Sequence, residues 1–154
     1  MSNARQERRR KIFLKRNFLS GKRKVVKFLS EQTSLNDYFK NRISKHGELP
    51  AITDTYCNIS MNFNQVEEQI SAFAAALQSF GVKKGDFVGI FTENNGRWCI
   101  CEQGTMRTGA VCTLRGSNAP VTELDYIINH SESMGLILRD GKLFNGLKPY
   151  LEKY

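Results

Sequence analysis

The chain of 154 residues has no apolar run of transmembrane length and no apolar stretch near its start. A membrane-spanning helix needs about 20 consecutive apolar residues, and a secretory signal needs an apolar segment of about 7–15 residues. We therefore expect neither feature. The composition is that of an ordinary globular chain, with 40% hydrophobic and 25% charged residues, and its length favours one folded domain.

The motifs that usually accompany nucleotide or hydrolytic chemistry are also missing. A phosphate-binding loop needs spaced glycines before a Gly-Lys pair and a hydroxyl residue after it. The Gly-Lys pairs of this sequence, Gly21-Lys22 and Gly141-Lys142, have neither. There is no GxGxxG after a predicted strand, no GxSxG and no HExxH in the sequence. We therefore predict no catalytic, cofactor-binding or metal-binding residue in this chain.

Histidine and cysteine are scarce and poorly spaced for metal binding. The pair Cys99-x-Cys101 is too close for a zinc knuckle, and no histidine stands at ligand spacing. We predict that the four cysteines are reduced packing residues of a cytosol-like compartment. The two histidines lie next to predicted helix ends and are interpreted as structural. The residues concerned are Cys57, Cys99, Cys101, Cys112, His46 and His130.

Positive charge is concentrated at the start of the chain. Residues 1–30 hold eleven Lys or Arg and one acid, Glu7, whereas residues 31–154 hold twelve bases and fourteen acids. The net charge of +8 therefore divides into about +10 for a basic N-terminal tail and −2 for the rest. Apolar residues between the bases favour an anionic membrane surface or a targeting role over nucleic acid, although a solvated tail is the first interpretation.

Alternating helix and strand patterns follow the tail and predict an α/β layer with short parallel strands and crossover helices. Strands are predicted near residues 51–53 and 57–63 as a hairpin, and as apolar runs at 87–91, 109–114 and 134–138. Helices are predicted after residue 34, at 64–80, from 96 to about 107, after 121, and from about 141 toward the end. We expect this body to leave part of its apolar strand surface uncovered.

Caps mark the ends of the central helix. Asn64 is predicted as its N-cap with Glu67 closing a capping box, and an apolar stripe runs from Val66 to Phe80. Gly81 is predicted to take the left-handed position that ends the helix. The run Gly81–Asp86 is interpreted as a helix stop followed by a turn.

These segments, taken in order, resemble the N-terminal part of the AMP-forming acyl-CoA synthetases, the adenylate-forming superfamily. The first motif of that superfamily resembles Asn62–Leu77 followed by Gly81–Asp86, and its strand with a following Asn and Trp resembles Val88–Trp98. Its Leu-Lys-Ala-Gly-Ala motif resembles Met106–Val111. The sequence from Cys112 to Asn118 departs from the usual Val-Pro-Leu and is similar to a long-chain fatty acid ligase branch of cyanobacteria and plastids.

The resemblance covers about residues 33–154 and implies a fatty-acid-activating ligase. Members of this superfamily form an acyl-adenylate from ATP and a carboxylate, with Mg²⁺, and a thiol of CoA or acyl carrier protein then displaces AMP. The motifs that handle phosphate in the family lie beyond this region. We therefore expect a truncated, inactive part of the enzyme, whose partners are the remainder of that enzyme and its substrates.

Other interpretations remain open at this point. The domain division is 1–30 for the basic tail and 31–154 for the partial AMP-binding domain. Arg115 is a tempting site residue, but an arginine after a strand is more often a structural or solvated charge. The alternative function is a non-catalytic binding module whose tail engages anionic lipid or, less favourably, nucleic acid. The expected location is the cytoplasm, with peripheral membrane or plastid association as alternatives.

Overall fold

The computed structural model describes residues 34–152. The predictions for the basic tail, residues 1–30, fall outside the described residues. The chain divides into a unit that ends at Asn41 and a second that comprises residues 42–154, and each is described by itself. Within the described part, no helix has the length and apolar character needed to cross a membrane.

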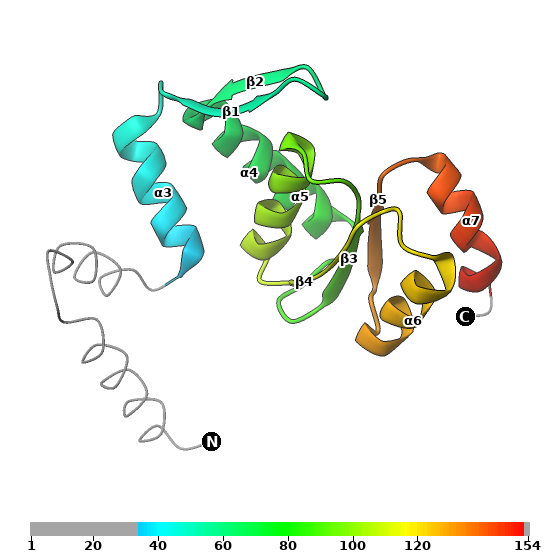
Figure 1. Ribbon diagram of the computed structural model, residues 1–154. Coiled ribbons are helices and arrows are strands. Elements are labelled where there is room, and N and C mark those ends of the chain that lie inside the picture. The colour runs from blue at the N-terminus through cyan, green and yellow to red at the C-terminus, as the bar shows by residue number, and fades with distance from the viewer. Residues whose placement is uncertain (1–33, 153–154) are drawn as a thin grey trace, which may run out of the picture. The chain divides into compact units, whose positions relative to one another are not determined.

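Helix α3, Leu35–His46, runs across the boundary between the two units (Figure 1). Ser34 accepts a hydrogen bond at Oγ from the backbone N–H of Asp37 (3.1 Å) and donates to the Asp37 carboxylate (2.8 Å). Ser34 therefore caps the helix that was predicted to begin after residue 34, because its hydroxyl pairs with one of the unpaired N–H groups of the first turn. His46 is the last helical residue, as predicted.

Strands β1, Pro50–Asp54, and β2, Ile59–Asn62, form the predicted antiparallel hairpin. Thr53 faces Ser60 in the register, and an irregularity lies between Pro50 and Ile52. The second strand is shorter than predicted at both ends. Its C-terminal limit has a simple cause, because the chain enters the next helix at Phe63.

The N-cap of helix α4, Phe63–Ser79, is Asn62 and not Asn64. The Asn62 side chain accepts from the Gln65 N–H (2.9 Å), and the Gln65 side chain accepts from the Asn62 N–H (2.9 Å), which completes a capping box. The prediction was wrong by two residues because Asn64 already lies in the first turn. The Asn64 amide donates instead to Glu48 (2.7 Å).

The apolar stripe of α4 is buried through most of its length. Val66, Ile70 and Ala74 are buried as predicted, whereas Phe80 is 80% exposed. Phe80 lies at the C-cap and therefore beyond the last turn that can pack. Gly81 has φ of +92°, which confirms the left-handed residue that ends the helix.

The turn after α4 is held by its own polar groups. The Asp86 carboxylate accepts from the Lys83 N–H (2.6 Å), and the Asp86 N–H donates to the Lys83 carbonyl (3.1 Å). Gly85 takes a φ of +93°, which a side chain would strain. This run is therefore a structural turn, as predicted.

The centre of the fold is a parallel sheet of three strands in the order β4-β3-β5 (Figure 1). Strand β3, Phe87–Phe91, pairs on one side with β4, Val111–Arg115, and on the other with β5, Gly135–Leu138. The crossover helices are α5, Gly96–Arg107, between β3 and β4, and α6, Val121–Ser131, between β4 and β5. Helix α7, Gly141–Leu151, follows β5. The predicted α/β layer with parallel strands is therefore confirmed.

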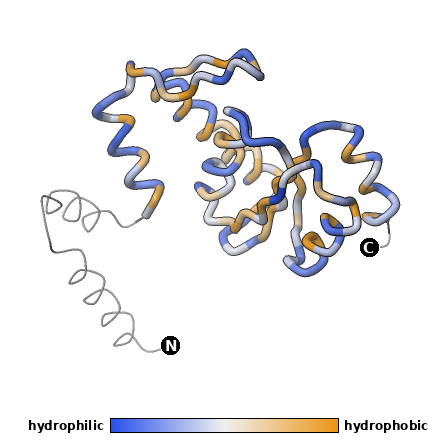
Figure 2. Tube along the Cα trace, viewed as in Figure 1, coloured by the Kyte–Doolittle hydropathy of each residue, from blue (hydrophilic) through white to orange (hydrophobic). Residues whose placement is uncertain are grey.

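Residues of β3 alternate between two differently covered faces. Phe91 packs in a cluster with Leu124 and Leu147 of α6 and α7, whereas Val88 packs with Val82 and Ala110 on the opposite face. Helix α5 contacts β3 and β4, and α6 also contacts both strands. Figure 2 shows that the strands are largely apolar and that polar residues occupy much of the helices. The strand is therefore buried on both sides, as its continuous apolar sequence predicted.

The sheet is less well covered where its strands begin. Phe87 is 38% exposed, its register partner Val111 is 42% exposed, and Met134 just before β5 is 48% exposed. These residues are neighbours, because the Met134 N–H donates to the Phe87 carbonyl (2.9 Å). An exposed apolar patch was expected from the sequence, and its effect on self-association stays a prediction.

Helices α4 and α5 approach closely at a glycine. A Cβ atom on Gly104 would lie 2.8 Å from the Phe73 ring and 3.2 Å from the Ile70 carbonyl oxygen. Beside this contact, the Arg107 guanidinium forms a two-point ion pair with the Glu67 carboxylate and donates to Ser71 Oγ (2.7 Å). The close approach and the charged clamp fix α5 against α4.

Asp54 joins the hairpin to the start of helix α5. One carboxylate oxygen accepts from the N–H groups of Tyr56 (2.9 Å) and Cys57 (3.0 Å) in the turn after β1. The other accepts from the N–H of Gly96 (2.8 Å), the first residue of α5. These bonds, with Gly96 first, hold the pKa of Asp54 below its ordinary value of 3.8. A negative charge at this helix start is also favoured by the helix dipole.

The lowered pKa of Asp54 leads to a pH-dependent prediction. The ionised carboxylate stabilises the fold above pH 3.8, and this contribution is lost as the pH falls through the lower pKa of the folded state. We expect Asp54→Asn to lower the Tm at pH 7 and to reduce the further loss of Tm between pH 5 and pH 3. Thermal unfolding followed by circular dichroism measures both values.

The matched control is Glu68→Gln, which removes a carboxylate from the exposed side of α4. We expect it to leave the Tm at pH 7 nearly unchanged. Equal pH profiles for the wild type and Asp54→Asn would show that Asp54 does not couple the hairpin to α5.

Candidate functional site

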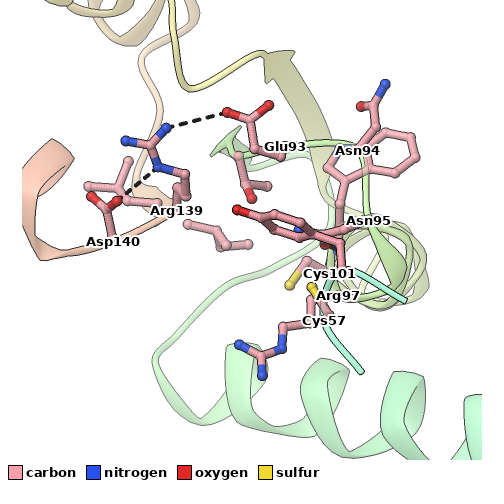
Figure 3. A pocket seen from close by; sticks show the side chains of 13 residues that line it. Cys57, Glu93, Asn94, Asn95, Arg97, Cys101, Arg139 and Asp140 are labelled. Atoms are coloured by element: carbon pink, nitrogen blue, oxygen red, sulfur yellow. Dashed lines mark hydrogen bonds and ion pairs between the residues drawn. The ribbon is translucent and has the colours of Figure 1, made fainter. Parts of the chain in front are cut away.

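An open pocket of about 850 Å³ lies at the carboxyl ends of the parallel strands (Figure 3). Its walls include the residues that follow β3, from Thr92 to Asn95, and the residues Arg139 and Asp140 that follow β5. The first residues of α5 and the turn of the β1–β2 hairpin line it as well. Three separate segments of the chain, residues 56–57, 92–101 and 137–140, therefore meet at one edge of the sheet.

The connections of the sheet explain why a pocket forms here. The chain leaves β3 into α5, which packs on one face of the sheet, and leaves β5 into α7, which packs with α6 on the other. Two adjacent parallel strands thus continue to opposite faces, which opens a crevice between their carboxyl ends. Ligands of open α/β sheets bind preferentially at such points. The pocket is therefore the candidate functional site.

A polar network links the loops that follow all three strands. Glu93 follows β3, Ser117 follows β4 and Arg139 follows β5. The Ser117 hydroxyl donates to the Glu93 carboxylate and accepts from Arg139 Nη1 (3.1 Å). Ser117 is only 5% exposed, so its hydroxyl needs these partners. This network connects the three loops at the carboxyl ends of the strands.

Arg139 is held by carboxylates on two sides. Its Nε donates to Asp140 (2.8 Å) and its Nη1 lies 3.4 Å from Glu93 (Figure 3). These bonds, Asp140 first, raise the pKa of the arginine. Asp140 also caps α7 by accepting from the Leu143 N–H (2.8 Å), and this bond and Arg139 lower the pKa of the Asp140 carboxyl. The guanidinium is therefore a fixed cation at the pocket wall.

Aromatic and charged side chains complete the pocket. Trp98 of α5 is half-buried, whereas Tyr56 in the hairpin turn is 86% exposed. Arg97, the second residue of α5, adds another cation. Asn95 caps α5 by accepting from the Trp98 N–H (2.9 Å), which fixes the start of this wall. The lining thus combines aromatic surface, amides, two arginines and two carboxylates, a mixture of apolar and polar groups that is typical of a site for a small organic ligand.

The residues weighed in the sequence lie elsewhere. Arg115 forms an exposed ion pair with Glu123 (Nε–Oε1 2.7 Å) and is not among the pocket residues. His130 stacks on Tyr126 of the same helix, with ring centroids 5.5 Å apart. The network of Glu93, Ser117 and Arg139 was missed. Part of its signal was available in the sequence, because each of the three residues follows a predicted parallel strand. The order of the strands in the sheet could not be read from the sequence.

The described residues offer little to a metal ion. No group of three or more His, Cys, Asp or Glu side chains within residues 34–152 is arranged to hold a metal. The two carboxylates at the pocket, Glu93 and Asp140, are already engaged by Arg139. The donor set therefore does not fit Mg²⁺, and no step through ATP or Mg²⁺ is derived from this chain.

Comparison with protein families matches residues 39–152 to the AMP-binding enzymes. Among similar curated proteins, the chloroplastic long-chain-fatty-acid–[acyl-carrier-protein] ligase of Arabidopsis thaliana is 35% identical over 118 residues, which cover 75% of this chain and 16% of the relative. A probable chloroplastic acyl-activating enzyme of the same plant is 35% identical over 140 residues, covering 90% of this chain and 19% of the relative. The chain thus spans less than a fifth of these relatives.

Solved structures agree with the sequence match. The N-terminal subdomain of NpsA from Klebsiella oxytoca is similar with a TM-score of 0.65 and 25% identity, over 70% of this chain and 28% of that one. An anthranilate CoA ligase gives a TM-score of 0.69 at 21% identity, over 75% of this chain and 22% of that one, which supports the fold alone. The chain belongs to the family of AMP-binding enzymes and has the fold of the N-terminal subdomain of adenylate-forming enzymes.

Proposed function

We propose that this chain is the N-terminal part of a ligase that activates a long-chain fatty acid as an acyl-adenylate and transfers the acyl group to a thiol. The observation that carries the proposal is the 35% identity to a chloroplastic long-chain-fatty-acid–[acyl-carrier-protein] ligase over 75% of the chain. A second chloroplastic acyl-activating enzyme supports it over 90% of the chain.

The division of labour follows from the residues present. The sequence contains no phosphate-binding loop, and the described carboxylates do not fit Mg²⁺. ATP and Mg²⁺ are therefore proposed as cofactors of the whole enzyme, bound by residues outside this chain. This chain supplies a scaffold and one wall of a ligand site, in which Arg139 is a cation held in place by Asp140 and Glu93 and Arg97 adds an exposed cation. Such preorganised charge stabilises anionic groups without reorganisation during the reaction.

The thiol acceptor is proposed as acyl carrier protein or CoA. Relatives of both kinds exist, since an Escherichia coli long-chain-fatty-acid–CoA ligase is 28% identical over 68% of this chain. The proposed location is a plastid or the cytoplasm. The chloroplastic names of the two plant relatives favour the plastid.

A chimera tests the proposed function. Residues 39–152 replace the matching segment of the Arabidopsis chloroplastic ligase, and acyl-thioester formation is measured with ATP, a long-chain fatty acid and acyl carrier protein or CoA. We expect activity from the chimera and none from the 154-residue chain alone. A folded chimera without activity contradicts the proposed function, and fatty-acid-dependent ATP–pyrophosphate exchange by the isolated chain contradicts the division of labour.

Two arginines provide a matched comparison within that chimera. Both stand at the carboxyl ends of parallel strands, Arg115 as the last residue of β4 and Arg139 directly after β5. Arg139 lines the pocket, whereas Arg115 is an exposed ion-pair residue. Arg139→Ala is expected to lower thioester formation by about tenfold or more, because a positioned cation is lost. Arg115→Ala is expected to change it by less than about twofold. Equal effects would show that the pocket has no special role.

We also propose that residues 1–30 associate with anionic lipid surfaces. The specific observation is a net charge of about +10 within thirty residues, interspersed with apolar side chains. Each basic residue near an anionic leaflet contributes about 1 kcal/mol, and salt screens this attraction. This candidate gives the chain a binding role independent of catalysis.

Co-sedimentation with vesicles that contain phosphatidylserine tests the role of residues 1–30. We expect binding at low salt that falls as the salt concentration rises, and loss of binding when residues 1–30 are deleted. Unchanged binding of the deletion variant disproves the proposal. Neutral phosphatidylcholine vesicles are the matched control, and preferential binding of RNA over vesicles would favour the nucleic-acid alternative.

A further inference from the structure

Two free cysteines from different elements line the same pocket. Cys57 lies in the turn between β1 and β2, and Cys101 lies on α5. Figure 3 shows both sulfur atoms in the same part of the pocket. The proposed function makes no use of either thiol.

Backbone contacts explain how the two thiols come to one place. Asp54 accepts from the N–H of Cys57 and from the N–H of Gly96, so the turn is fixed against the start of α5. Arg97 follows Gly96 and also lines the pocket. Because residues four apart lie on the same side of a helix, Cys101 faces the same way as Arg97. Cys57, Arg97 and Cys101 all line this pocket, and Figure 3 shows the three side chains in the same part of it.

The other two cysteines have different surroundings. Cys99 lines a separate hollow that includes Ile52 and Thr53 of β1. Cys112 of β4 donates from Sγ to the Glu102 carbonyl (3.7 Å). Neither lines the pocket that holds Cys57 and Cys101. Cys99 and Cys112 are therefore internal controls for any thiol reaction that is specific to Cys57 and Cys101.

We propose that Cys57 and Cys101 are a redox pair that closes reversibly to an intramolecular disulfide, with a hydroperoxide as oxidant. One thiolate attacks the peroxide oxygen, which breaks the O–O bond, yields a sulfenic acid and releases water or an alcohol after protonation. The second thiol then attacks the sulfenic sulfur and displaces the hydroxyl group as water. Two electrons pass from the two sulfur atoms to the peroxide, and both thiol protons end in the products.

The surroundings assign the order of attack. Both thiols are half-buried, but Cys57 follows the 86% exposed Tyr56 in the hairpin turn, whereas Cys101 is on the helix that forms the wall. Cys57 therefore reacts first and Cys101 resolves it. Burial first, and Asp54 second, raise the pKa of Cys57, and burial raises that of Cys101. The reaction should therefore quicken as the pH rises from 7 to 9, because the thiolate is the nucleophile.

The disulfide would join the hairpin turn to α5 across the pocket wall. At present this junction is held by the hydrogen bonds of Asp54. A covalent link there would fix the distance between the turn and the helix, and with it the width of this part of the pocket. The inference does not depend on which reaction the whole enzyme performs.

Peptide mapping of the 154-residue chain tests the pairing. The protein is treated with hydrogen peroxide at pH 8, remaining thiols are blocked with N-ethylmaleimide, and the chain is digested without reduction. Trypsin leaves Cys99 and Cys101 in one peptide, so the mapping uses the double variant Cys99→Ser, Cys112→Ser. We expect a peptide in which Cys57 is joined to Cys101, and recovery of both thiols with dithiothreitol.

Further variants decide between a specific pair and general oxidation. Cys101→Ser is expected to abolish the intramolecular link and to leave Cys57 trapped as sulfenic acid, which dimedone detects. A disulfide needs Cα atoms within about 7 Å, so its formation also reports the approach of the turn to the helix. The proposal is overturned if Cys57 stays reactive to N-ethylmaleimide after peroxide, or if both thiols become sulfinic acids without a link. It is also overturned if the Cys101→Ser variant still joins Cys57 to the peptide 98–107, in which Cys99 is then the one remaining cysteine.

Discussion

The fold depends on burial of one short strand, β3, on both edges and both faces. It is paired with β4 and β5 through backbone hydrogen bonds, and its residues Val88, Ile90 and Phe91 are almost completely buried. The two faces hold separate apolar clusters. One is formed with residues of α6 and α7, and the other with Val82 and Ala110, which lie in the loops after α4 and α5. Since apolar burial contributes about 25 cal/mol per Å², a strand enclosed in this way anchors the elements around it.

The position of β3 also creates the pocket. Because the central strand continues into α5 on one face and β5 continues into α7 on the other, their carboxyl ends separate and leave a crevice. The network of Glu93, Ser117 and Arg139 then ties the loops above the three strands into one surface. The hairpin turn also contributes to this surface, and the hydrogen bond from the Gly96 N–H to the Asp54 carboxylate holds it against the start of α5. Packing of the sheet and geometry of the site are thus consequences of the same strand order.

Local sequence signals predicted the elements well and their spatial order poorly. Gly81, Ser34 and the Asn95-Gly96 start of α5 were recognisable because caps depend on near neighbours along the chain. The N-cap of α4 was misplaced because Asn62 and Asn64 offer the same side chain, and only the end of β2 decides between them. Phe80 continues the helical period but lies past the last packed turn.

The candidate site was missed in the sequence for a different reason. Glu93, Ser117 and Arg139 are 22 to 46 positions apart, and they meet only because β3 lies between β4 and β5. If the strands lay in the sheet in the same order as along the chain, β4 and not β3 would be the central strand. Family resemblance supplied the fold without assigning a role to any of these residues. The same holds for the contact of Asp54 with Gly96, which joins segments 42 positions apart.

Native-state hydrogen exchange of the 154-residue chain tests the central role of β3 most directly. The account predicts that the amides of Val88, Gly89 and Ile90 exchange only with global unfolding, and that those of the β1–β2 hairpin exchange sooner. Their protection should fall in parallel with the free energy of unfolding as denaturant is added. If the β3 amides exchange as fast as those of the hairpin under native conditions, the strand is not the anchor of the fold and this account is wrong.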